Sequence, residues 1–412
     1  MNTALHPNPA TRPDEDGTDS QTLITMRPAL NDEAFIAKQG KAFSAAFHQT
    51  MRGEVEGAMS TYLFYDLSAD SDSAFGGLSY DASSILSGGR AWERRINENA
   101  AKAPSEGHSF IGDDKQVIGF ALKKGLLALL PDKIQYVSYG GGDEQAFTAN
   151  EGQLIKAAQN DPAKQILNFC SVDILPRYVD TMTYAASRRY KLDSQGVQGD
   201  FLRNGRLAIN KVDGATPVVM IFGGPFENVS VDTQKPDTAE QAETNVAIAW
   251  GKMNIQHGLG SIVVKTFDSD QDKASQEAKY APTRNFEAFE LSFLARAVEN
   301  GIIKNADYDV FEHWRLTSEY DVAARANKLH AECKKDHTLQ TVEGDQPFKA
   351  GDRRTITLSH KWDQAVHIRA AERAGYEVLE VFTQPGNKNL LMVAKAVRDP
   401  DADILKSIPY PR

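Results

Sequence analysis

The sequence contains few of the residues from which metal sites and disulfide frameworks are built. Its only cysteines are Cys170 and Cys333, far apart in a chain of 412 residues. Two distant thiols exclude the disulfide scaffold of a small secreted domain and a Cys-rich zinc site. No other convincing set of metal ligands is present. We therefore expect a protein that binds no metal.

Long apolar runs and an excess of basic residues are missing as well. Apolar runs such as GLLALLP at 125–131 fall far short of the roughly 20 residues that span a bilayer. The N-terminal segment lacks the basic-then-apolar order of a secretion signal. Acidic residues outnumber basic ones by 56 to 46, a net charge of −10, which disfavours nucleic acids and anionic membranes as partners. The sequence predicts a cytoplasmic protein that binds a small molecule, and it does not indicate an oligomeric state.

What remains is ordinary globular composition, with 41% apolar and 25% charged residues. A chain of this length exceeds what one simple core supports, so two lobes are expected. Residues 1–30 are rich in polar residues and proline, which predicts a disordered lead-in. Residues 61–89 form a connection rich in Ser, Asp and Gly that is too long to be idle in a compact domain.

Helical and strand patterns alternate from about residue 115, which predicts a mostly parallel, doubly wound α/β sheet. The expected strands are 134–139, 165–173, 216–224 and 261–268, and the expected helices are 116–130, 148–160 and 238–256. Beyond 270 we expect helices near 284–300 and 319–334, a strand at 353–359, a helix at 363–375, and strands at 376–383 and 390–397. The final hairpin is typical of the class I methyltransferase sheet, whose last strand runs antiparallel, whereas a Rossmann dehydrogenase ends with parallel strands.

Three consecutive glycines, Gly140, Gly141 and Gly142, follow the first of these strands. A dinucleotide fingerprint needs a third, later glycine, and none is present. The acidic residues Asp143 and Glu144 would repel a pyrophosphate at this point. They tolerate a cationic ligand such as S-adenosylmethionine (SAM). The alternative reading of the glycines is an ordinary structural turn.

Acidic residues follow the next strands. Asp173 ends a strand and could accept hydrogen bonds from ribose hydroxyls, or it could be a turn or N-cap aspartate. Asp200 could accept the adenine amino group while Phe201 packs on the ring; the alternative is a turn residue beside a core phenylalanine. Asn228, after the strand that leads to Gly223, offers donors and acceptors to a zwitterionic amino acid, or it serves a turn.

In this order the motifs resemble the histidine-specific, SAM-dependent methyltransferases over roughly residues 60–400. That family carries a G-x-G loop, a strand ending V-D-x-S, an acid–Phe pair and F-L-G-S-T-I-G-N. The matching segments are YGGGD at 139–143, VDILP at 172–176, GDF at 199–201 and FGGPFEN at 222–228. The resemblance implies that Tyr139 and Gly223 also contact the cofactor and that Asn228 binds substrate.

Further segments extend the resemblance. The family's W-x-Y-D is similar to YLFYD at 62–66, and its T-D-x-x-K-D segment with a following tyrosine is similar to 266–280, which implies catalytic roles for Tyr65 and Tyr280. The segment 348–362 is similar to F-x-x-G-E-x-x-x-T-E-x-S-x-K and adds Thr357 and Ser359 to the substrate site. Thr357 replaces the glutamate that holds an imidazole, so the resemblance predicts a substrate other than histidine.

Together these observations predict a class I, Rossmann-like SAM methyltransferase domain at 111–270 and 362–412, with a smaller α+β substrate domain at 31–110 and 271–361. The expected reaction is methyl transfer from SAM to the amine of a small amino-acid-like molecule, with S-adenosylhomocysteine as product. Three alternatives stay open. They are aminocarboxypropyl transfer or cyclisation of SAM, silent binding of SAM or a nucleotide, and, more weakly, NAD(P) oxidoreduction.

Overall fold

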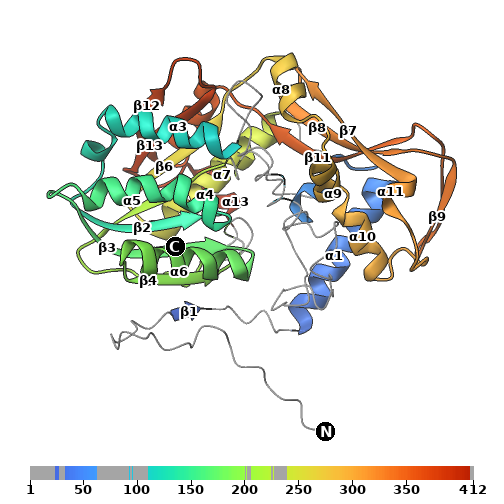
Figure 1. Cartoon of the computed structure of the whole chain (residues 1–412), viewed down its shortest axis with the longest axis horizontal. Helices are drawn as coiled ribbons and strands as arrows, with labels where there is room; N and C mark the ends of the chain where they lie inside the picture. The colour runs from blue at the N-terminus through green and yellow to red at the C-terminus, as the bar shows by residue number, and fades with distance from the viewer. Residues whose placement is uncertain are drawn as a thin grey trace, which may run out of the picture.

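The computed structural model arranges the chain in two lobes, of which Figure 1 shows the larger on the left and the smaller on the right. The residues that the structure describes are 24–26, 33–62, 92, 95, 110–199, 201, 206–223, 226 and 239–408. Three predicted site residues, Tyr65, Asp200 and Asn228, lie outside them. So does the lead-in 1–30, except for residues 24–26.

The larger lobe is built on one eight-stranded sheet with the order β1-β4-β3-β2-β5-β6-β13-β12. The strands are β1 Ile24–Met26, β2 Lys133–Tyr139, β3 Gln165–Asp173, β4 Ser194–Gln198, β5 Thr216–Ile221, β6 Ile262–Asp268, β12 Tyr376–Thr383 and β13 Asn389–Ala396. Neighbours pair in parallel except β13, which is antiparallel to both β6 and β12. This order confirms the predicted class I methyltransferase sheet and its closing hairpin.

Helices cover both faces of this sheet, and its central strands are therefore buried on both sides. Tyr136 packs on one face with helices α3, α5 and α6, while Val137 and Tyr139 pack on the other with α7 and α12. The helices of this lobe are α3 Phe110–Lys123, the short 3₁₀ turn η4 Leu126–Leu129, α4 Glu144–Ala149, α5 Glu151–Gln159, α6 Pro176–Tyr190, α7 Ala239–His257, α12 Gln364–Arg373 and α13 Ala402–Ser407. None of the helices that the structure describes is long and apolar enough to cross a membrane.

The smaller lobe has its own apolar core, in which helices pack against the antiparallel sheet β11-β8-β7. Its strands are β7 Trp314–Asp321, β8 Ala326–Cys333 and β11 Arg353–His360, with the separate hairpin β9 His337–Thr341 and β10 Gly344–Phe348. Its helices are α1 Glu33–Met51, η2 Ala58–Tyr62, α8 Lys273–Lys279, α9 Arg284–Glu290, α10 Ser292–Glu299 and α11 Val310–His313. Most of this lobe is thus inserted between β6 and α12 of the larger one.

The helix predicted at 319–334 is wrong, because this segment forms the hairpin of β7 and β8. Its alanines and lysines favour a helix, but strand pairing against β11 and burial of β8 outweigh that weak propensity. The reversal is set by Asp321, whose carboxylate accepts the amides of Ala323 and Ala324, and by Arg325 with a left-handed φ of 49°.

Candidate cofactor and substrate site

The candidate site lies where the parallel strands of the larger lobe end. Strands β2, β3, β4, β5 and β6 run in the same direction, so the loops after them meet at one edge of the sheet. Ligands of open α/β sheets bind outside this edge. The inserted part of the smaller lobe begins directly after β6, at the same edge, and α8 is its first helix (Figure 1).

The three glycines after β2 are each required by the geometry. Gly140 and Gly142 have left-handed φ values of 65° and 71°, which side chains disfavour. At Gly141 a Cβ atom would lie 2.4 Å from the sulfur of Met182 and 2.8 Å from the hydroxyl of Ser138. The backbone of this loop therefore packs directly against helix α6, with no side chain in between. The following Asp143 caps α4, since its carboxylate accepts the Ala146 amide at 2.8 Å.

Asp173 lies beside this loop and is also a turn residue. Its Oδ1 accepts the Leu175 amide at 2.9 Å, ahead of helix α6. Burial raises its pKa to about 7, although the amides of Leu175, Ile174 and Gly142 act in the opposite direction. The two sequence readings of Asp173 are thus compatible, because one oxygen can close the turn while the carboxyl borders the glycine loop.

Phe201 packs close to the same loop. A Cβ at Gly140 would lie 4.0 Å from its ring, and the rings of Phe201 and Tyr139 are 5.0 Å apart in an edge-to-face contact. The side chain of Tyr139, in contrast, is fully buried, and its hydroxyl is 2.8 Å from His257 Nε2 in α7. Only the backbone of Tyr139 therefore borders the loop. Gly223 ends the β5 segment with a φ of 81° and donates its amide to the Thr266 hydroxyl at 3.3 Å.

Two acidic residues that the sequence interpretation missed lie at this edge. The Ser138 hydroxyl donates to Oε1 of Glu151 at 2.7 Å, and Glu151 is 1% exposed. In the part of the chain that the structure describes, Glu151 Oε2 is buried without a hydrogen-bond partner. Burial raises the Glu151 pKa to about 8, and the nearby charge of Asp114 raises it further.

Asp114 reaches the edge from the N-terminal half of α3. It accepts Asn389 Nδ2 at 2.9 Å, and the Thr266 hydroxyl and the Gly223 amide also lie against it. Burial still raises its pKa to about 6. Asp114, Glu151 and Asp173 thus form a group of three buried carboxyls around the glycine loop. The one hint in the sequence is that the family's acid before the glycine loop falls on Ser138 or Tyr139 in this chain.

The predicted substrate residues Thr357 and Ser359 lie on β11, and Tyr280, the C-cap of α8, contacts this strand. The hydroxyls of Tyr280 and Ser359 are 2.8 Å apart, and Lys361 donates to Ser359 Oγ at 2.8 Å while lying over the Tyr280 ring. Two residues earlier on the strand, Thr357 donates to Glu290 Oε2 at 2.7 Å. Tyr280, Ser359 and Thr357 are therefore brought together, with Lys361 and Glu290 as partners that sequence reasoning did not assign.

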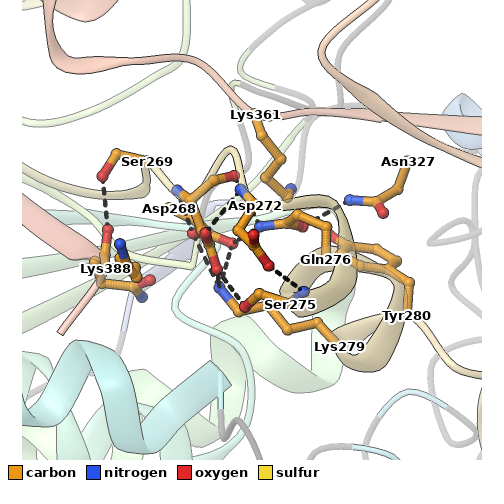
Figure 2. A network of polar contacts seen from close by, with 12 residues as sticks. Asp268, Ser269, Asp272, Ser275, Gln276, Lys279, Tyr280, Asn327, Lys361 and Lys388 are labelled. Carbon is orange, nitrogen blue, oxygen red and sulfur yellow. Dashed lines mark hydrogen bonds and ion pairs between the residues drawn. The ribbon is translucent and has the colours of Figure 1, made fainter. Parts of the chain in front are cut away.

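Figure 2 shows the polar network that joins the end of β6 to the smaller lobe. Lys279 pairs with Asp268 at 3.0 Å and with Asp270 at 3.3 Å. Gln276 donates to Asp268 Oδ2 at 3.2 Å and accepts from Asn327 of β8 at 2.8 Å. The side chain of Gln271 donates to the Lys361 carbonyl at 2.6 Å. Helix α8 thereby fixes β8 and β11 to the sheet edge that carries the glycine loop.

The strand order with its closing antiparallel hairpin is that of a class I methyltransferase. A family model described as histidine-specific methyltransferase, SAM-dependent, matches residues 128–396. This match covers more than half of the chain, so the protein belongs to that family. Among proteins with curated annotation, no relative of the chain was found.

Several solved methyltransferase structures overlap with this one at low identity. A SAM-dependent methyltransferase from Clostridium acetobutylicum is 8% identical, with 74% of this chain and 100% of that chain covered and a TM-score of 0.37. The CcbJ methyltransferase from Streptomyces caelestis is 10% identical, with 73% and 98% covered and a TM-score of 0.35. SAM-bound CalS10, an amino pentose methyltransferase from Micromonospora echinaspora, is 12% identical, with 78% and 99% covered and a TM-score of 0.34. Such TM-scores support no conclusion, and the assignment rests on the strand order and the family match.

Proposed function

We propose that the protein transfers a methyl group from SAM to the amine of a small amino-acid-like substrate and releases S-adenosylhomocysteine. The observation that supports a cationic cofactor is the group of buried carboxyls Asp114, Glu151 and Asp173 around the glycine loop. Burial penalises the charged form of these carboxyls; Arg177 acts on Asp173, and a bound cation would offset the penalty at Glu151 and Asp114. A pyrophosphate would be repelled there, which disfavours NAD(P).

The residues at the sheet edge suit the parts of SAM. The backbone of Gly140–Gly142 leaves room for close approach, and Asp173 would accept the ribose hydroxyls. Phe201 would pack on the adenine ring, with Asp200 as the acceptor for its amino group. Glu151 and Asp114 offer carboxyls to the ammonium of the methionine part, and Glu151 Oε2 still has an unused acceptor site among the described residues.

SAM supplies an already activated methyl group, so the protein has mainly to position the amine and to let its proton leave. We assign the positioning of the amine to Tyr280 and Tyr65, and the proton of the amine leaves to water. The Tyr280 hydroxyl contacts the Ser359 hydroxyl, which accepts a hydrogen bond from Lys361, and these contacts position the phenol. Asn228, Thr357 and Ser359 would complete the substrate site, within a substrate domain of residues 31–110 and 271–361 beside a SAM domain of 111–270 and 362–412.

The expected exclusion of histidine has only one argument behind it, the threonine at position 357. The Thr357 hydroxyl contacts the Glu290 carboxyl, so a carboxyl group is present next to the position where the family's glutamate is absent. The proposed substrates are therefore small amino acids in general, histidine included.

The test is mass spectrometry of the products after incubation with methyl-labelled SAM and a panel of free amino acids. Methyl transfer yields S-adenosylhomocysteine and a heavier amino acid. Methylthioadenosine would instead show aminocarboxypropyl transfer or cyclisation, and SAM binding without any product would show a silent binding protein. In parallel, Asp173→Asn should weaken S-adenosylhomocysteine binding at least tenfold while the fold stays intact; unchanged affinity would remove Asp173 from the ribose role.

A further inference from the structure

We propose that Arg95 is a positioning residue for the methyl transfer, because it holds the turn that carries Tyr280. This inference rests on the proposed function, in which Tyr280 positions the amine. It adds to that function a residue whose guanidinium acts through Tyr280. Arg95 belongs to none of the sequence motifs that resemble the family.

Arg95 lies inside the smaller lobe and contacts the end of one helix and the start of the next. The residue is 4% exposed. Its Nη2 donates to the Lys279 carbonyl at 3.0 Å, and its Nη1 donates to the Thr283 hydroxyl at 3.4 Å. Lys279 is the last residue of α8, and Thr283 is the N-cap of α9. The guanidinium therefore bridges the two ends of the short turn that contains Tyr280.

These contacts suit a guanidinium better than a neutral side chain. The last carbonyls of a helix have no partner within the helix, and a cation at this end interacts favourably with the helix dipole. A planar guanidinium can donate in two directions and also stack on an aromatic ring, and the Arg95 Cζ lies 5.1 Å from the centre of the Phe286 ring. Phe286 in turn packs edge-to-face with Tyr280, with 6.0 Å between the ring centres. Arg95 thus fixes both the backbone before Tyr280 and the ring on which Tyr280 packs.

The other contacts of Tyr280 show what this turn positions. The Ser318 hydroxyl of β7 donates to the Tyr280 carbonyl at 2.9 Å, so the peptide groups before and after Tyr280 are both held. The Tyr280 hydroxyl lies 2.8 Å from that of Ser359. Methyl transfer requires an in-line geometry, and a misplacement of about 1 Å can lower the rate about 100-fold. Without Arg95 we expect the turn to relax and the amine to be misaligned.

The first test is hydrogen–deuterium exchange of the unliganded, full-length protein. Arg95→Gln should speed exchange at least tenfold in the amides of residues 280–287, whereas the control Arg354→Gln should leave them unchanged. Arg354 makes the same kind of contact elsewhere in the smaller lobe: it donates to the carbonyl of Met51, the last residue of α1, at 2.6 Å and lies 5.1 Å from the centre of the Phe348 ring. Unchanged exchange of residues 280–287 in Arg95→Gln would overturn the proposal.

The second test asks whether Arg95 acts through Tyr280, with methyl-labelled SAM and the panel of free amino acids as substrates. Arg95→Gln should lower kcat at least tenfold and leave the KM for SAM unchanged. Arg95→Lys should recover part of this loss, since an ammonium can still donate to the Lys279 carbonyl. In a Tyr280→Phe background, Arg95→Gln should lower kcat less than threefold further. A purely structural role would lower kcat by the same factor in both backgrounds.

The outcomes separate this inference from the proposed function. A wild type that methylates no amino acid would overturn the proposed function, and the exchange test would still decide whether Arg95 holds the turn. Turnover by the wild type with an equal loss in both Tyr280 backgrounds would overturn only the positioning role. If Arg95→Gln does not fold, Arg95→Lys replaces it in both tests and should give smaller changes in the same direction.

Discussion

At the scale of single residues, the glycine loop is defined by packing as much as by backbone conformation. Gly140 and Gly142 adopt left-handed conformations, but Gly141 is the residue that has no space for a side chain, because Met182 and Ser138 lie against its Cα. A triple-glycine motif read from sequence alone indicates flexibility. In this structure the three glycines instead allow the backbone to pack tightly between the end of β2 and helix α6.

We predict that Gly141→Ala destabilises the protein by about 1–3 kcal/mol, because the added methyl must displace Met182 or Ser138. It should also weaken S-adenosylhomocysteine binding, since the loop has to shift. Urea unfolding and calorimetry measure the two effects. Gly40→Ala is the control: that glycine lies inside helix α1 with nothing within 4 Å of a Cβ, so alanine should be neutral or stabilise by roughly 0.5–1 kcal/mol. Equal stability of the two variants would contradict the packing argument.

At the scale of elements, helix α8 is the connection that fixes the smaller lobe to the sheet edge. Its residue Lys279 is buried, with 3% of the side chain exposed, and pairs with Asp268 and Asp270. Removing one partner of a buried pair leaves an uncompensated charge, which costs far more than the pair contributes in net terms. The network in Figure 2 therefore depends on Lys279 more than on any exposed ion pair of the same helix.

Lys279→Met should therefore destabilise the protein by about 3–5 kcal/mol and weaken amino-acid binding. Lys273→Met on the same helix is the control, because Lys273 forms an exposed pair with Glu277 whose loss should cost less than about 1 kcal/mol. Thermal or urea unfolding gives the first effect, and titration of the protein saturated with S-adenosylhomocysteine gives the second. If the two lysine variants behave alike, α8 does not hold the lobes together in the way described.

The elements also show which parts of the fold the sequence could predict. Strands β2, β3 and β6 are short, mostly apolar and buried on both faces. A short apolar segment of this kind predicts a buried strand from the sequence alone. Strand β8 carries alanines and charged residues, and only pairing with β7 and β11 makes it a strand. Likewise Glu151 and Glu290 face the site from helices, distant in sequence from the residues they contact, so no local motif contains them.

At the scale of the whole molecule, the carboxyls at the sheet edge couple ligand binding to pH. The pKa values of Asp114, Asp173 and Glu151 are raised by burial to about 6, about 7 and about 8. Consider a group whose pKa is higher in the folded than in the unfolded protein. Its contribution to stability is complete at pH values below the unfolded pKa and is lost as pH rises through the folded pKa. The three carboxyls therefore make the unliganded protein less stable as pH rises from about 4 to about 8.

Ligand affinity should follow the opposite trend. The ammonium of S-adenosylhomocysteine favours the charged carboxylates, so binding releases protons near pH 7 and tightens as pH rises from 6 to 8. Titrations in two buffers of different ionisation enthalpy measure the protons released. Glu151→Gln should release fewer protons and flatten the pH dependence, whereas the control Glu372→Gln, at an exposed position on α12, should match the wild type. A dissociation constant that stays constant from pH 6 to 8, with no proton release, would mean that these carboxyls do not face the bound cation.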